Sequence, residues 1–206
     1  MHARLRRARR KLLPSLAGLA VAAVLAGTGA FATWTATTSA GNTLATGTVV
    51  IALGNTGPAT NRLTVNASGL VPGDTVQRSF DLANTGSQDL ASVALTTTAS
   101  PSSLLDTDTT NGLQMVIDRC SAAWTESGSS PAFTYSCSGS TTTILTSRPV
   151  IQTSLALPGI SALTGGGSDH LRLTLTFPSS AGATFQGVSS TLSYSFLGTQ
   201  RAGAAH

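Results

Sequence analysis

Residues that could do chemistry are few in this chain of 206 residues, and they form no familiar catalytic pattern. Beyond residue 11 the only histidines are His170 and His206. The sequence contains neither an HExxH segment nor a Gly-x-Ser-x-Gly elbow. A Ser-His-Asp triad would therefore depend on His170 alone. Since Asp169 and His170 open a predicted strand after a glycine run, we predict that the pair is solvated at a turn rather than catalytic.

The segment DTDTTNG at residues 106–112 resembles part of a calcium-binding loop. It departs from the EF-hand spacing by one position, and Ile117 stands where the twelfth-position glutamate would be. A polar turn is the favoured interpretation. The sequence thus predicts no metal ligand, no catalytic residue and no cofactor.

The chain has two cysteines, Cys120 and Cys137, and we predict that they form a disulfide. Closing a loop of this length stabilises the fold by about 3 kcal/mol in the chain-entropy model. A metal or redox pair is the alternative, but the short Cys-x-x-Cys spacing and a nearby histidine are missing. Trp124 lies within the loop, either as an exposed recognition residue or packed against the disulfide, and the sequence leaves both open.

The first 32 residues have the pattern of a secretory signal peptide, which we expect to be helical. Residues 1–11 hold six basic side chains, and residues 12–26 are uncharged. Ala30 and Ala32 fit the small-x-small rule for signal peptidase, with cleavage before Thr33. An uncleaved membrane anchor is the alternative, but a span needs about 20 apolar residues. The pattern predicts a secreted, extracellular or cell-surface protein that meets the membrane only transiently.

Removing the signal peptide reverses the charge of the chain. The full sequence has 12 basic and 8 acidic residues, a net charge of +4. Without the six basic residues at 1–11, six basic residues remain against eight acidic ones, giving a net charge of −2. No basic surface is left to hold phosphate groups, so nucleic-acid binding is not expected.

The rest of the chain has the pattern of an antiparallel β protein. Residues 70–86, LVPGDTVQRSFDLANTG, show a Pro-Gly-Asp turn, a nearly alternating apolar stretch and an Asn-Thr-Gly turn. Short strands separated by turns predict an all-β, two-sheet sandwich of jelly-roll type. The expected strands lie near 46–53, 61–66, 75–83, 90–98, 113–119, 133–137, 142–152, 170–177 and 190–198, with one short helix within 153–164.

The predicted domain organisation and core follow from the same pattern. A signal peptide occupies 1–32, a mobile N-terminal segment 33–45, the sandwich 46–200 and a tail 201–206. The predicted core side chains are Val76, Phe80, Leu82, Val93, Leu95, Met115, Ile117, Leu173, Leu175, Leu192, Tyr194 and Phe196.

Three stretches together resemble the TasA/camelysin family of secreted bacterial proteins. The first is GTGAFATW at 27–34 followed by GNTLATGTV at 41–49, similar to the signal region and first strand of the family. The second runs from Pro72-Gly73-Asp74 to Asn84-Thr85-Gly86, and the third is LRLTLTFP, FQG and LSYSF within 171–200. The segment from about 100 to 160 is the least similar.

The resemblance implies a jelly-roll fold, a dedicated signal peptidase and assembly into fibres of a biofilm matrix. Camelysin-like members are instead described as metalloendopeptidases, which is the alternative function, although the sequence offers no clustered zinc ligands. An adhesin or ligand-binding module at the cell surface is a second alternative.

The segment freed by signal cleavage suggests how fibres would form. Residues 33–47, TWTATTSAGNTLATG, are uncharged and place Trp34, Ala36 and Thr38 on one face at period 2. Such a segment can add as a strand to an exposed sheet edge of the next subunit, giving a homopolymer. It could instead fold back and cap its own subunit, or stay disordered.

Overall fold

A computed structural model of the chain describes residues 35–38, 50–54, 59, 61–63, 65–67 and 69–203. The signal peptide, the cleavage residues Ala30, Ala32 and Thr33, and Trp34 lie outside the described residues. Of the N-terminal segment predicted to be mobile, Thr35–Thr38 form a strand, β1. His206 lies outside as well.

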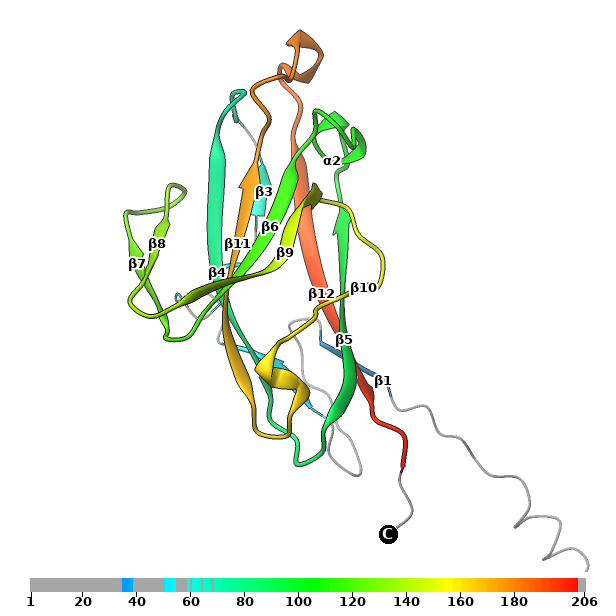
Figure 1. Cartoon of the computed structure of the whole chain (residues 1–206). Coiled ribbons are helices and arrows are strands. Elements are labelled where there is room, and N and C mark those ends of the chain that lie inside the picture. Colours follow the sequence, from blue (N-terminus) through cyan, green and yellow to red (C-terminus); the bar gives the residue numbers. More distant parts are fainter. Residues whose placement is uncertain are drawn as a thin grey trace, which may run out of the picture. The chain divides into compact units, whose positions relative to one another are not determined.

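Two five-stranded antiparallel sheets make up the domain (Figure 1). Sheet A consists of β1 (Thr35–Thr38), β3 (Val65–Ala67), β5 (Leu90–Ala99), β10 (Leu155–Ala156) and β12 (Ser190–Gln200). Sheet B consists of β2 (Ile51–Leu53), β4 (Thr75–Asn84), β6 (Gln114–Cys120), β9 (Thr141–Pro149) and β11 (Ser168–Thr176). The all-β, antiparallel prediction is therefore confirmed.

The smaller elements connect or flank these sheets. A hairpin of β7 (Trp124–Ser127) and β8 (Thr134–Cys137) forms a third sheet. The helical turns are α2 (Leu104–Thr107), η1 (Ser161–Leu163) and η2 (Ala183–Phe185). The short helix expected within 153–164 corresponds to η1.

Strand order within the two main sheets brings together segments that are distant in sequence. Sheet A follows the order β1-β12-β5-β10, with β3 also on β12, and sheet B the order β2-β4-β11-β6-β9. Among the described strands, only β7 and β8 are both consecutive in the chain and paired with each other. Every pairing that positions the main sheets is thus long-range, a topology that folds slowly.

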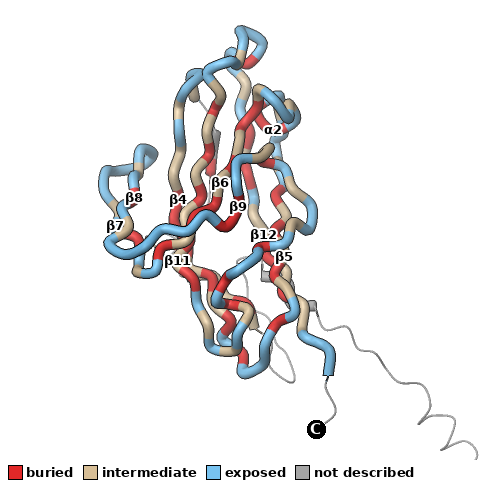
Figure 2. Tube along the Cα trace, viewed as in Figure 1, coloured by how far each residue is buried: buried red, intermediate tan, exposed pale blue. Residues whose placement is uncertain are grey.

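The hydrophobic core lies between the two sheets. In β11 the alternating residues Leu171, Leu173 and Leu175 are buried, as the period of 2 requires (Figure 2). Phe80 of β4 meets Phe196 of β12 with ring centroids 5.4 Å apart, so the inner faces of the sheets are in contact. Ten of the twelve predicted core residues are buried, and Val76 and Tyr194 are partly buried against the same core.

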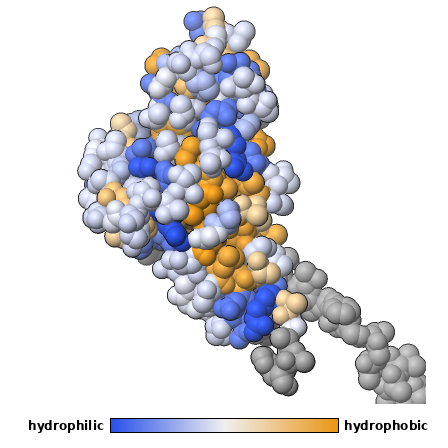
Figure 3. All heavy atoms as spheres, viewed as in Figure 1, coloured by the Kyte–Doolittle hydropathy of each residue, from blue (hydrophilic) through white to orange (hydrophobic). Residues whose placement is uncertain are grey.

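Large apolar side chains are exposed at only a few described positions: Val71, Leu104 and Ile151. On the side of the molecule seen in Figure 3, hydrophobic residues gather in a band down the middle, with hydrophilic residues around it.

Candidate functional site

The two cysteines anchor the β7–β8 hairpin to sheet B. Cys120 ends β6 and Cys137 ends β8, and a disulfide joins them with their Cα atoms 5.7 Å apart. Trp124 is buried against this disulfide together with Tyr135. Its indole Nε1–H donates to the carbonyl oxygen of His170 at 3.0 Å. Of the two roles left open for Trp124, the structure shows packing against the disulfide.

Charged side chains hold the rest of the hairpin in place. The guanidinium of Arg62 donates twice to the carboxylate of Glu126, at 2.8 and 3.0 Å, and the Tyr135 hydroxyl donates to it at 2.7 Å. The hydrogen bonds from Arg62 lower the pKa of Glu126, and its partial burial opposes this. Arg172 donates to Asp118 at 2.8 Å and stacks 4.4 Å from the Trp124 ring. These groups attach the hairpin to the sheet.

The Asp169-His170 pair is divided between two different contacts. Asp169 is buried rather than solvated, and its carboxylate accepts hydrogen bonds from the backbone N–H groups of Ser161 and Ala162 at 2.9 and 2.8 Å. It thereby caps η1. His170 is partly exposed and lies with its Nδ1 2.7 Å from Oδ1 of Asp81.

Both carboxylates in the calcium-like segment have structural partners. Asp106 is buried and accepts hydrogen bonds from the hydroxyls of Ser102 and Ser190, at 2.6 Å each, and from the backbone N–H of Ser103 at 2.7 Å. Asp108 accepts from two backbone N–H groups in its own turn. The segment is an α2 cap followed by a tight turn, as the polar-turn interpretation predicts.

A zinc site does not fit the described residues. Zinc requires three or four nitrogen, sulfur or oxygen ligands converging on one point. His170 and Asp81 supply one such pair, whereas Asp118 and Asp169 are bonded to arginines and Asp106 to serines. No group of three or more His, Cys, Asp or Glu side chains that could hold a metal ion occurs in the described part of the chain.

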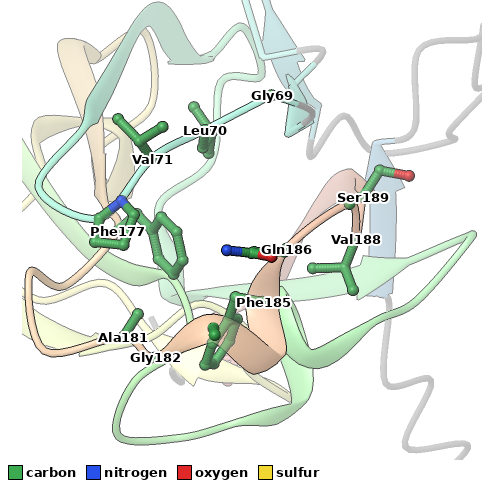
Figure 4. A pocket seen from close by; sticks show the side chains of 13 residues that line it. Gly69, Leu70, Val71, Phe177, Ala181, Gly182, Phe185, Gln186, Val188 and Ser189 are labelled. Atoms are coloured by element: carbon green, nitrogen blue, oxygen red, sulfur yellow. The ribbon is translucent and has the colours of Figure 1, made fainter.

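An uncharged hollow of about 760 Å³ opens at one end of the sandwich (Figure 4). Its wall includes Leu70, Val71, Phe177, Phe185 and Val188, and none of its lining residues is charged. Figure 4 shows the Gln186 side chain lying between these apolar groups. Phe177 and Phe185 pack edge to face with centroids 5.4 Å apart. Residues from two of the three stretches that resemble the TasA/camelysin family therefore meet at this hollow.

The N-terminal strand β1 lies on the edge of sheet A. It pairs antiparallel with the end of β12, with Thr35 opposite Thr199 and Thr38 opposite Phe196. Ala36 and Thr38, two of the three predicted donor-strand residues, thus belong to a strand seated on its own subunit. β3 pairs with the start of β12, at Ser190–Leu192. Among the described residues no strand lies beside Ser193–Ser195 on that edge.

Fold and site together define a disulfide-containing antiparallel β domain whose described carboxylates mostly serve structural contacts. The chain matches the family described as camelysin metallo-endopeptidase over residues 7–119, which is more than half of its length, and it belongs to that family. The resemblance to this family is therefore confirmed, and the matched residues include the first two of the three sequence stretches. A comparison with curated proteins finds no match. Within the described residues, no helix is long and apolar enough to cross a membrane.

Proposed function

We propose that the chain is a secreted, TasA-like structural protein of jelly-roll type that assembles into extracellular fibres of a biofilm matrix. The observation that carries this proposal is the position of β1. A strand of only four residues occupies a sheet edge of the domain, and it directly follows the predicted cleavage site. A second copy offers the same edge.

The energetics allow exchange of β1 between copies. A backbone hydrogen bond contributes a net free energy of about 1 kcal/mol. Fixing the backbone of one residue costs about 1–2 kcal/mol. A four-residue edge strand is therefore held weakly, and in a neighbouring copy it would make the same bonds as in its own. Such a contact is heterologous, so it continues as an open filament.

Secretion supplies the free strand in this proposal. A dedicated signal peptidase cuts before Thr33 and releases an N-terminus of uncharged residues that continue as far as Asn61. The membrane takes part only while the chain is exported. The homopolymer then grows outside the cell, through residues 33–42.

Deleting residues 33–42 from the mature protein tests the proposal by electron microscopy. We expect the full mature chain to form filaments and the deletion variant to remain monomeric, with its disulfide intact. The matched control replaces residues 33–42 by a Gly/Ser sequence of equal length, and it should also fail to polymerise. Filaments that grow at the wild-type rate without the segment would rule the mechanism out.

The name of the family keeps a camelysin-type metalloendopeptidase as the alternative function. Its test is chelator-sensitive cleavage of casein by the purified mature chain. We expect no cleavage. Chelator-sensitive turnover that is lost in His170→Ala would establish the enzyme and contradict the structural proposal.

The uncharged hollow favours a second alternative, a binding module or adhesin. A monomer that binds a sugar or protein tightly, and loses that binding in Phe185→Ala, would support this alternative over fibre formation.

A further inference from the structure

Charged residues are divided unequally between the two sheets. The strands of sheet B carry seven of them: Arg78, Asp81, Asp118, Arg119, Arg148, Asp169 and Arg172. The five strands of sheet A carry none. Arg172 of sheet B also donates to the carbonyl oxygen of Tyr135 in the β7–β8 hairpin at 3.3 Å. Sheet A therefore gives the domain one face built without charge.

The outer face of sheet A is formed by small side chains in register across β12 and β5. Ser193 lies opposite Thr98, Ser195 opposite Thr96 and Thr199 opposite Ser92. In the middle of the face Leu197 lies opposite Ala94, which in turn lies opposite Ala156 of β10. These residues are exposed or half-buried. An apolar centre flanked by hydroxyl groups is the usual layout of a protein interface.

We propose that this face is a lateral contact surface for the same face of a second copy, which joins filaments side by side into bundles. The inference rests on the proposed assembly into fibres for its role. The contact between two uncharged faces brings no like charges together, whereas the copies carry a net negative charge elsewhere. Serine, threonine and alanine side chains also allow two sheets to approach to about 10 Å.

The size of the face implies a weak contact for each subunit. β12 has 11 residues and β5 has 10, and a strand rises about 3.4 Å per residue. With strands about 4.8 Å apart, these two strands cover about 350 Å² per copy, or about 700 Å² in a pair. This is less than the roughly 1,000 Å² that a specific interface between two single copies needs. Repetition along a filament turns such a weak contact into strong bundling.

At one end the face adjoins a hollow of about 550 Å³ between β5, α2 and residues 149–153. Ile151, which is 36% exposed, is part of its lining. The hollow offers room for side chains of the opposing copy without close contact between backbones.

The test is the double variant Ser193→Lys/Thr98→Lys, which places two charges on opposite, exposed positions of the face. The matched control, Thr142→Lys/Thr146→Lys, adds the same charge at exposed positions of β9 in sheet B. In electron micrographs we expect single filaments for the first variant and bundles for the control and the wild type. The fraction that sediments at low speed should fall at least tenfold in the first variant only.

The salt dependence of bundling distinguishes charge repulsion between the introduced lysines from misfolding of the variant. At about 1 M salt the screening length falls to about 3 Å, so bundling of the Ser193→Lys/Thr98→Lys variant should return. Bundles that persist in this variant at low salt would overturn the inference, as would bundling that no salt concentration restores.

A wild type without filaments would refute the proposed function, and sedimentation equilibrium of the mature protein would then decide the inference. A wild-type dimer that is lost in the double variant supports it, and a monomer at every concentration refutes it.

Discussion

Asp106 allows a quantitative test of how the domain is held together. It is 5% exposed, and it joins α2 to the start of β12 through Ser103 and Ser190. Asp106→Ala removes the capping-box acceptor, which costs about 1 kcal/mol. It also removes the charged acceptor of the buried Ser190 hydroxyl, a hydrogen bond worth about 1.5–3 kcal/mol. We therefore expect the free energy of unfolding to fall by about 3 kcal/mol, measured by urea denaturation at pH 7.

The pH dependence of the unfolding free energy tests whether Asp106 stabilises the fold as a charged carboxylate. Burial alone would raise the pKa of Asp106, but hydrogen bonds from Ser102, Ser190 and Ser103 outweigh it and lower the pKa. A carboxyl group with a lowered pKa in the folded state stabilises the fold above its unfolded pKa of about 3.9. This contribution is lost as the pH falls through the folded pKa. The difference between wild type and Asp106→Asn should therefore shrink in acid.

Two results would refute this account of Asp106. One is a loss of less than about 1 kcal/mol in Asp106→Ala, which is below the cost of a lost helix cap. The other is a wild-type melting temperature that rises in millimolar calcium and does not rise in Asp106→Asn, because the segment would then be a calcium site.

Two further predictions concern the disulfide and the close packing of β12 against Ile51. Cys120→Ser/Cys137→Ser should lower the free energy of unfolding by about 3 kcal/mol in denaturant titrations, and an unchanged midpoint would contradict the anchoring role of the hairpin. Gly198→Ala should cost about 1–3 kcal/mol, because the added Cβ would overlap the side chain of Ile51. In the Ile51→Ala background, Gly198→Ala should cost much less stability than it does in the wild type. An equal cost in both backgrounds would show that this clash is not the cause.

The positions of the long strands could be predicted from the sequence. β4, β5, β6, β11 and β12 fall within about two residues of their predicted bounds, because each alternates apolar and polar residues between clear turns. The disulfide partners followed from there being only two cysteines in the chain.

Contacts between distant segments could not be predicted. β10 has two residues and forms because residues 152–157 are hydrogen-bonded along β5. β7 has no clear alternation and is defined by its pairing with β8. From the sequence, Asp169 is predicted to be a solvated turn residue, yet its partners include Arg119, 50 positions away. No local pattern reveals such a partner.

Cysteine cross-linking is the most direct test of β1 exchange, the central claim. Thr35 and Thr199 are opposite each other in the register of β1 and β12. In Thr35→Cys/Thr199→Cys, filaments built by exchange should give a covalent ladder of oligomers on a non-reducing gel. Each single variant can give at most a dimer. A double variant that forms filaments but yields only cross-linked monomer would show that β1 stays on its own subunit, and would contradict the account.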